Sequence, residues 1–488
     1  NVLATNHQHP RHLYVTRSPP YLPPNSHKTI KIRIFAARKN KPINETNMRF
    51  THKQIWVITF PILVSLLMEH LINMTDTAFL GRVGEVELGA SALAGVYYMA
   101  IYMLAFGFSI GAQILIGRRN GEGNYKDIGP IFIQGVLFLL GLATLMFTVS
   151  RIYTPSVLRS VIDSKQVYVA TNDYMKWRIF GFFFSFVAVM FRAFFVGITT
   201  TRILTINSLV MVGTNVMLNY LLIFGKFGFP ALGISGAAIG SFVAELVSMI
   251  FYILYTWKKV DWKKYTLFNL SSFNPKLLSG ILNISIWTMI QSFLAMATWF
   301  LFFIAVEHLG ERPLAVSNIV RSAAMFFFMP VSAFAATTSS LVSNLIGAQA
   351  TSQVWNTCLK TIKMCYLFVI PIGIIILLIP STFLRIYTDD PQLIRATIPS
   401  LFVMMSAVLL STPGSILFNA VSGTGNTRMA LFMEFGTLTF YVLYIIYIVF
   451  YLQADVAICW TTEHAYWIIL LTLGFMYMKS GKWAGKKI

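Results

Sequence analysis

The chain has 488 residues, of which 56% are hydrophobic and only 11% are charged, and its mean hydropathy is +0.67. These values exclude a soluble globular protein and are typical of a polytopic membrane protein. The net charge of +20 does not indicate a nucleic-acid partner, because Lys and Arg collect in loops and tails, as the positive-inside rule predicts.

The segment before the first apolar run is polar, basic and dotted with proline. It has neither the apolar core nor the cleavage site of a signal peptide. Met48 begins a short basic lead followed by a span, as at the start of a bacterial inner-membrane protein. We therefore expect residues 1–54 to be a basic, disordered extension, with Met48 as the natural start and 1–47 as an upstream addition without function.

Apolar runs of about 20 residues, the length that crosses a bilayer, recur twelve times. They cover about residues 55–80, 90–116, 129–150, 172–198, 204–225, 233–256, 279–306, 315–346, 358–381, 394–421, 429–453 and 457–478. The sequence therefore predicts an all-α polytopic membrane protein with twelve transmembrane helices.

The first span carries polar residues on one face. Glu69, Asn73 and Asp76 stand at positions i, i+4 and i+7, so all three project from the same side of the helix. Such a stripe would be prohibitively costly against lipid. We therefore expect it to face the interior of the first helix bundle, or water.

The fifth and sixth spans offer partners for this stripe. Asn215 and Asn219 share a face of the fifth span, and Ser241 and Glu245 share a face of the sixth. Together Asp76, Asn215, Asn219 and Ser241 supply the hard oxygen donors that suit a small cation or a proton. Glu69, Asn73 and Glu245 are further candidates for the same ion-coupling site. A sodium ion could be bound by Asp76, Asn215 and Asn219, or Asp76 could take up and release a proton. Alternatively, the polar groups could simply join helices.

The longest basic loop follows the sixth span and divides the spans six and six. With an even number of spans in each half, this loop and both basic termini lie on one side, which predicts cytoplasmic termini. Arg151, Arg159 and Lys165, in the third connection, run against this orientation. The predicted parts are a bundle at 55–256, a cytoplasmic linker at 257–278, a second bundle at 279–478 and a basic cytoplasmic tail at 479–488.

The two halves also resemble each other in sequence. A shift of 226 residues pairs Gly84 with Gly310 and Arg202 with Arg428. Because the matches fall mainly at loops and helix ends, we expect two six-helix bundles related by a pseudo-twofold axis along the membrane normal. The seventh span has no carboxylate at the position of Asp76, which places the polar chemistry in the first half only.

Several motifs together resemble the multidrug and toxic compound extrusion (MATE) family. They are "MTDTAFLGRVG", "GAQILIGRRNGEGN" with its echo "VSNLIGAQATS", the pair "GITTTR" and "SGTGNTR", and "NVMLNYLLIFGKFGFPALGISGAAIGS". The likeness covers about residues 55–478. It implies two six-helix bundles around a central cleft, and export of organic cations and other amphipathic compounds in exchange for sodium or protons.

The resemblance also assigns residues. It implies that Asp76 is the coupling aspartate, that Asn215 is the fifth-helix asparagine, and that Ser241 replaces a sixth-helix threonine. Asn219 stands where many relatives have a second aspartate, so sodium and proton coupling both stay open. The second-half carboxylates of one subgroup are also missing, since Gly414 and a glutamine occupy the corresponding spans.

The substrate cleft is harder to predict. Gln291 in the seventh span and two cations interpreted as buried, Arg192 and Arg321, are candidates. Either arginine could attract an anionic substrate or pair with a carboxylate, and Glu245 is a possible partner for Arg192. Aromatic side chains make up 15% of the chain and could hold flat cations by cation–π contacts.

The function predicted is a secondary antiporter in the bacterial inner membrane, not an enzyme, that exports small amphipathic organic cations as a monomer without a cofactor. A flippase for a lipid-linked precursor is a second reading, but its cleft would need more Arg and Lys than the spans carry. A membrane-embedded transferase is a third, but no metal-binding or nucleophile motif of such enzymes occurs.

Overall fold

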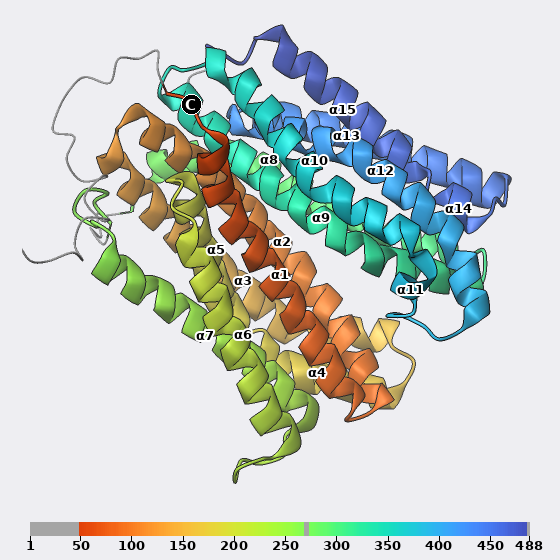
Figure 1. Ribbon diagram of the computed structural model, residues 1–488. Coiled ribbons are helices and arrows are strands. Elements are labelled where there is room, and N and C mark those ends of the chain that lie inside the picture. Colours follow the sequence, from red (N-terminus) through yellow and green to blue (C-terminus); the bar gives the residue numbers. More distant parts are fainter. Residues whose placement is uncertain (1–47, 268–272, 486–488) are drawn as a thin grey trace, which may run out of the picture. The chain divides into compact units, whose positions relative to one another are not determined.

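The computed structural model describes residues 48–267 and 273–485 (Figure 1). The predicted upstream extension, residues 1–47, lies outside this part of the chain. The first half contains α1 (His52–Gly81), α2 (Glu85–Glu122), the 3-10 helix η1 (Tyr125–Asp127), α3 (Ile128–Val161), α4 (Lys165–Arg178), α5 (Gly181–Gly197), α6 (Arg202–Phe224) and α7 (Gly233–Lys259). The second half contains α8 (Pro275–Glu307), α9 (Glu311–Gly347), α10 (Ser352–Leu378), α11 (Pro380–Leu384), α12 (Pro391–Gly423), α13 (Thr427–Ile446), the π-helical turn η2 (Tyr447–Tyr451), α14 (Val456–Cys459) and α15 (Thr462–Ser480).

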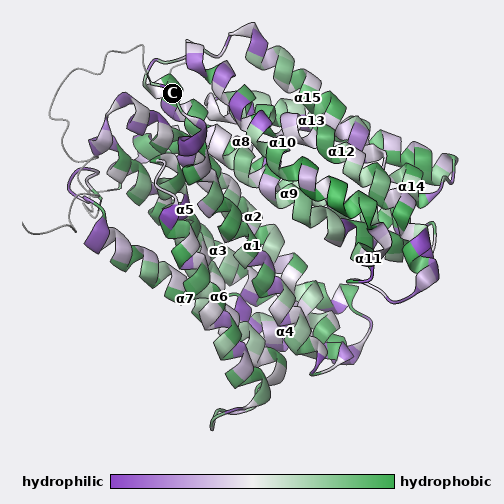
Figure 2. Cartoon of the chain, viewed as in Figure 1, coloured by the Kyte–Doolittle hydropathy of each residue, from purple (hydrophilic) through white to green (hydrophobic). Residues whose placement is uncertain are grey.

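The twelve predicted spans are confirmed within the described residues. Eleven helical segments are long and apolar enough to cross a membrane, and α4 and α5, bent by 52° relative to each other, pass the same test as a pair. Hydrophilic residues gather at the helix ends and connections, as Figure 2 shows. The helices of the first half, α1–α7, form a first lobe, and those of the second half, α8–α15, form a second lobe.

The third connection differs from the prediction. Helix α3 continues to Val161 instead of ending near residue 150, so Arg151 and Arg159 lie on its exposed last turns. The connection to Lys165 is only three residues long, 162–164. Apolar length predicts only the part of a helix that lies inside the bilayer. It could not predict the polar last turns of α3, which continue the helix beyond that part.

Helix starts follow from local sequence. Thr51 accepts a hydrogen bond from the backbone N–H of Gln54, whose side chain in turn accepts from the Thr51 N–H, which makes a capping box at the start of α1. Asn274 caps α8 directly before Pro275, which occupies the first helical position. Such caps fix where each span begins.

The internal repeat is visible in matched contacts. The Thr201 hydroxyl donates to the carbonyl of Ile58 at 2.8 Å, and its counterpart Thr427 donates to the carbonyl of Ile284 at 2.8 Å. Under the 226-residue shift, Thr201 corresponds to Thr427 and Ile58 corresponds to Ile284. The same bond therefore joins α6 to α1 and α13 to α8, which supports the duplicated unit.

The lobes meet where α2 and α9 end. A Cβ atom on Gly121 would overlap the carbonyl oxygen of Asn344, and one on Gly347 would overlap that of Arg118. The shift of 226 residues exchanges these two contacts, as an approximate twofold axis between α2 and α9 requires. Small residues of this kind allow close helix approach in a bilayer, where lipid removes most of the hydrophobic drive for packing.

Side-chain hydrogen bonds close the same end. Asn344 donates to the carbonyl of Gly197 at 2.9 Å and accepts from Asn120 at 2.7 Å. The buried guanidinium of Arg118 donates to the carbonyl of Thr424 at 3.1 Å. These bonds tie α2 and α5 to α9 and the end of α12, so this face of the protein is closed.

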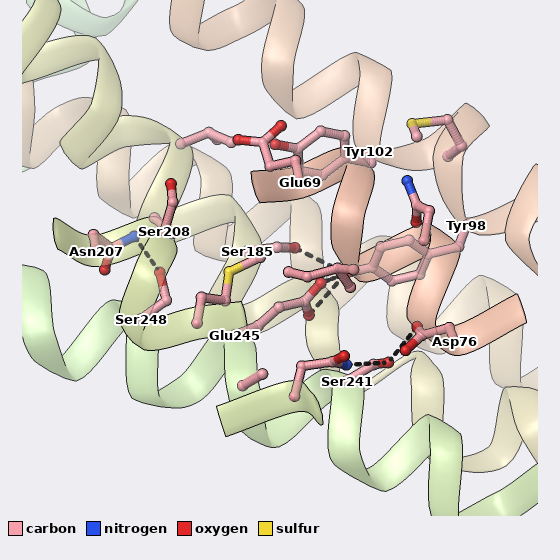
Figure 3. Close-up of a pocket in the computed structure, with 18 of the residues that line it drawn as sticks. Glu69, Asp76, Tyr98, Tyr102, Ser185, Asn207, Ser208, Ser241, Glu245 and Ser248 are labelled. Atoms are coloured by element: carbon pink, nitrogen blue, oxygen red, sulfur yellow. Dashed lines mark hydrogen bonds between the residues drawn. The ribbon is translucent and has the colours of Figure 1, made fainter. Parts of the chain in front are cut away.

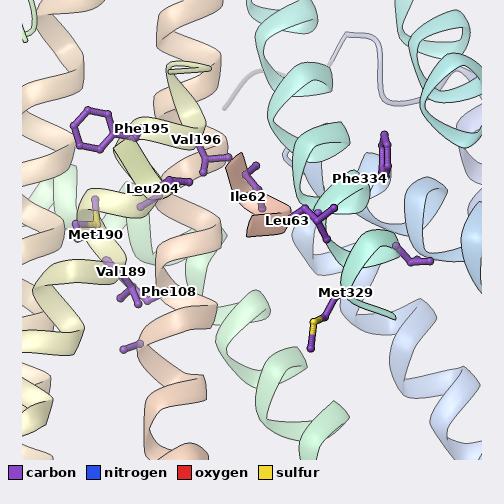
Figure 4. Packing of buried hydrophobic residues seen from close by; sticks show 14 of the residues in the cluster. Ile62, Leu63, Phe108, Val189, Met190, Phe195, Val196, Leu204, Met329 and Phe334 are labelled. Atoms are coloured by element: carbon purple, nitrogen blue, oxygen red, sulfur yellow. The ribbon is translucent and has the colours of Figure 1, made fainter. Parts of the chain in front are cut away.

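The buried apolar core is continuous between the lobes. Figure 4 shows Ile62 and Leu63 of α1 between Val196 of the first lobe and Phe334 of the second. Trp56 extends this packing, because its ring lies 6.4 Å from that of Phe334. Since lipid is as apolar as these side chains, we attribute the stability of this contact to close packing.

We expect Gly121→Ala to separate the two lobes at this end. The added methyl group would overlap the Asn344 carbonyl, and overpacking of this kind costs about 1–3 kcal/mol. A cost of this size would change the equilibrium between the closed and the opened state by about 5- to 150-fold in favour of the opened state. The distance between spin labels at the exposed residues Asn124 and Ser352 should therefore increase.

Gly141→Ala is the matched control, because no atom lies within 4 Å of a Cβ placed there on α3. An unchanged label distance in Gly121→Ala, with the control also unchanged, would contradict this prediction.

Candidate functional site

A cavity of about 230 Å³ lies within the first lobe (Figure 3). Helices α1, α2, α4, α5, α6 and α7 all contribute to its wall, and none of the described residues of the second lobe lines it. Its polar groups come from residues far apart in the sequence. The cavity therefore depends on the packing of the whole lobe.

The polar stripe of α1 faces this cavity, as predicted. Glu69, Asn73 and Asp76 all line it, because helical spacing aligns them on one side of an uninterrupted helix. Ser65, one turn earlier, donates weakly to Glu69 at 3.4 Å and shares a 2.8 Å hydrogen bond with Ser208 of α6. The stripe is thus anchored against α6.

Asp76 is the centre of a hydrogen-bonded cluster that joins α1, α6 and α7. Asn219 donates to its Oδ1, and the hydroxyl of Ser241 donates to its Oδ2 at 3.3 Å. Asn215 accepts from Asn219 at 3.2 Å and donates to Ser241 at 3.3 Å. The structure therefore brings together Asp76, Asn215, Asn219 and Ser241, the four residues predicted to supply the oxygen donors.

The cluster is shielded from solvent on the side of α6. Asn215 and Asn219 are fully buried, and Ser241 is 6% exposed. Gly240 allows α7 to approach, because a Cβ atom there would overlap Oδ1 of Asn219. That oxygen is buried and accepts no hydrogen bond from the described residues. Carboxylate, carboxamide and hydroxyl oxygens therefore converge where a proton or a small cation could be held.

Glu245 does not pair with Arg192, so that prediction is wrong. Its partner is Arg178 of α4, whose Nη2 lies 2.7 Å from Oε1 and whose Nη1 lies 2.9 Å from Oε2. The sequence did not reveal the bend between α4 and α5 that turns Arg178 inward. This bidentate contact compensates the charge of Glu245 and joins α7 to α4 in the cavity wall.

Tyr98 of α2 completes this ion pair. Its hydroxyl donates to both Glu245 oxygens at 3.1 and 3.0 Å and lies 3.0 Å from the hydroxyl of Ser185. The Arg178 guanidinium lies 3.5 Å from the centre of the Tyr98 ring. Neither Arg178 nor Tyr98 was among the predicted site residues. A charged residue directly before the apolar run "IFGFFFSFVAVM" was the available signal for Arg178.

The predicted substrate residues do not come together. Arg192 lines the first-lobe cavity, with its guanidinium 5.1 Å from the ring of Phe106. Gln291 lies on α8 of the second lobe and does not line this cavity. Arg321 is exposed on α9, so its interpretation as a buried cation is wrong.

The second lobe is not free of carboxyl groups, which corrects the expectation that polar chemistry lies in the first half only. Glu434 of α13 is 1% exposed and Glu463 of α15 is 5% exposed. Both were overlooked because they do not match a first-half carboxylate under the 226-residue shift.

Comparison with known proteins supports the internal repeat and identifies relatives. The MatE family model matches residues 61–221 and 288–448, two segments whose starts are 227 residues apart. A probable multidrug resistance protein NorM of Thermotoga maritima is 24% identical over 444 residues, covering 89% of this chain and 94% of that protein. The probable NorM protein of Synechocystis sp. is 24% identical over 358 residues, covering 72% and 77%.

Solved structures share the fold. An outward-facing conformation of a multidrug resistance MATE family transporter of the MOP superfamily superposes with a TM-score of 0.81 at 18% identity, covering 89% of this chain and 97% of that one. The eukaryotic MATE transporter AtDTX14 superposes with a TM-score of 0.77 at 17% identity, covering 88% and 96%.

Proposed function

This chain belongs to the MatE family of multidrug efflux transporters, and from that premise we propose that it is a secondary antiporter that exports amphipathic organic cations by alternating access. The driving ion is a sodium ion or a proton that binds at Asp76. No covalent step and no resident cofactor are part of this proposal. The two similar lobes would rock about their shared contact to expose the cavity to either side of the membrane.

The observation that carries the proposal is the cluster around Asp76. An ionisable residue within a span is costly, and such residues commonly mark ion pathways. The donors from Asn219 and Ser241 stabilise the carboxylate when it is charged. Ion uptake would weaken or rearrange these bonds. Because they join α1 to α6 and α7, occupancy of Asp76 would change how the helices of the first lobe pack.

The cavity wall supports a cationic substrate. Tyr102 and Tyr252 present aromatic rings, whereas the ring of Tyr98 already contacts Arg178 and Phe182. Glu69 provides a carboxyl group that forms no ion pair among the described residues. Aromatic faces and a carboxylate suit an organic cation. A lipid-linked pyrophosphate would need several free cations, whereas Arg178 is already paired with Glu245.

We place the protein in the bacterial inner membrane as a monomer with both termini in the cytoplasm. The basic residues of the α7 end and linker, Lys258, Lys259, Lys263 and Lys264, support this orientation. In that orientation, the closed end where α2 and α9 meet faces the cytoplasm. The division into bundles at 55–256 and 279–478 is part of the same proposal.

Transport by everted vesicles tests the function and identifies the ion. A fluorescent organic cation would be added to vesicles on which a proton gradient or, in a separate experiment, a sodium gradient is imposed, in each case high inside. One of the two gradients should drive accumulation above that of vesicles lacking the protein. Accumulation that is unaffected by both gradients would contradict ion-coupled export.

A further inference from the structure

The second lobe contains a buried carboxyl pair that the coupling scheme above does not use. Glu434 lies on α13 and Glu463 lies at the start of α15. With exposed fractions of 1% and 5%, both are more deeply buried than the ion-paired Glu245, whose side chain is 12% exposed. Isolated charges at such depth in a membrane protein are costly and call for a compensating ligand or proton.

The hydrogen bonds to both carboxyl groups come from aromatic side chains. Tyr466 donates to Oε1 of Glu434 at 2.8 Å, and Trp467 donates to Oε2 of Glu463 at 3.1 Å. Tyr441 adds a longer contact of 3.4 Å to Oε1 of Glu463. The Tyr466 ring lies 4.8 Å from that of Trp467 and 5.9 Å from that of Tyr441, so one aromatic cluster holds both acids.

None of these donors carries a charge, and neither glutamate forms an ion pair within the described ranges. Moreover, Oε2 of Glu434 is buried and has no hydrogen-bond partner among the described residues. An ionised Glu434 would leave both its negative charge and this oxygen uncompensated. A proton on Glu434 removes the charge without requiring a further protein group.

The surrounding helices supply no other charge to the site. Helix α8 has no titratable residue between Lys276 and Glu307, and α12 has none between Arg395 and its end at Gly423. Apart from the Arg428 at its start, the titratable residues of α13 are Glu434 and tyrosines.

Helix α9, which contacts Trp467 through Phe328, has no charged residue after the exposed Arg321. Asp455, directly before α14, is exposed, and the buried thiol of Cys459 contacts the carbonyl of Ala454. Tyr447 and Tyr451 of η2 are exposed. His464 of α15 lies beside Ser406 of α12, with 2.9 Å between Nε2 and the hydroxyl, instead of bonding a carboxyl group. Tyr466 and Tyr441 are thus the titratable groups in contact with the two acids.

The internal repeat relates this cluster to the Asp76 cluster. The 226-residue shift carries Asn215 to Tyr441 and Ser241 to Trp467. Two members of the first-lobe cluster therefore correspond to the two donors that contact Glu463. The second lobe keeps a carboxyl group against these positions, although it comes from the twelfth span instead of the first.

We propose that Glu434 and Glu463 form a second proton-binding site, in the second lobe, which is loaded in this conformation. Proton binding here does not depend on Asp76 or on which ion drives export. If the protein works as the antiporter proposed above, the site would release and rebind its protons as the second lobe rearranges. More protons would then move per exported substrate.

Infrared spectroscopy of purified protein in nanodiscs at neutral pH tests the site without requiring transport. The carbonyl band of protonated carboxyl groups should be present in the wild type. It should lose intensity in Glu434→Gln and in Glu463→Gln, and lose most in the double variant. Glu307→Gln, which changes an exposed glutamate at the end of α8, is the control and should leave the band intact.

Tyr466→Phe keeps both acids and should shift the frequency of the Glu434 band, since it removes one hydrogen bond. This milder variant keeps the test decisive even if a glutamine variant fails to fold. An undiminished band in a folded double variant, or an unshifted band in Tyr466→Phe, would overturn the proposal. Loss of the band on adding sodium at constant pH would also overturn it, because the ligand would then be a metal cation.

Asp76→Asn separates this site from the proposed coupling mechanism. The second-lobe band should persist in that variant. A wild type that shows the band but no ion-driven export would contradict the antiport proposal and leave the second-lobe site standing. A wild type that couples export to an ion but lacks the band would contradict only the second-lobe site.

Discussion

Replacing Asp76 with asparagine should abolish ion-driven efflux and leave the protein folded in the membrane. Asparagine has nearly the same shape and can still accept a hydrogen bond from Asn219 or Ser241. However, it can neither take up a proton nor offer a negative charge to sodium. Coupling between two bound ligands is typically worth about 1–3 kcal/mol, which corresponds to a change in affinity of about 5- to 150-fold. In Asp76→Asn, the ion should therefore no longer change substrate affinity by this factor.

The measurement is accumulation of a fluorescent cation in everted vesicles at matched protein abundance. Asp173→Asn is the control, because the Asp173 carboxylate on α4 is 40% exposed and, among the described residues, forms an ion pair only with Lys176 one turn away. The control should transport like the wild type. Gradient-dependent accumulation that survives in Asp76→Asn would refute the assignment of Asp76.

Replacing Arg178 with methionine should produce the largest loss of stability. The guanidinium and the Glu245 carboxylate are each only 12% exposed, and two hydrogen bonds join them. Removing one member leaves an uncompensated charge beside Tyr98, which costs about 3–5 kcal/mol for a buried pair. Thermal unfolding of the purified protein, followed by loss of monodisperse protein, should show a large fall in midpoint temperature.

A second substitution distinguishes lost charge balance from lost packing. The double variant Arg178→Met with Glu245→Gln removes both charges, so most of the stability should return. Lys176→Met removes one partner of the exposed pair with Asp173 and should cost about 0–1 kcal/mol. If Arg178→Met were as mild as Lys176→Met, the ion pair would not stabilise the first lobe.

The sequence was most informative where one helix or a simple repeat determines the outcome. Apolar length was enough to locate the spans, and spacing at i, i+4 and i+7 was enough to place Glu69, Asn73 and Asp76 on one face. The 226-residue shift likewise predicted two related bundles, and the equivalent hydrogen bonds of Thr201 and Thr427 agree with it. These features depend on local geometry or on duplication.

The sequence was least informative where two helices must be oriented relative to each other. The sequence offered Arg192 as a partner for Glu245, whereas the bend between α4 and α5 brings Arg178 to it instead. Arg321 lies in an apolar span but on its exposed side. The order of apolar and polar residues along that span did not show which side of the helix is exposed. The carboxyl pair of the second lobe was missed because its aromatic partners look like ordinary packing residues in sequence.

Substrate-driven ion movement by the purified protein tests the central claim most directly. Proteoliposomes loaded with an organic cation, with no ion gradient imposed, would be diluted into substrate-free buffer while proton and sodium movements are recorded. We predict that substrate exit drives one of these ions inward in the wild type and that Asp76→Asn shows no such movement. Substrate exit without ion movement in the wild type, or the same ion movement in Asp76→Asn, would contradict exchange at Asp76.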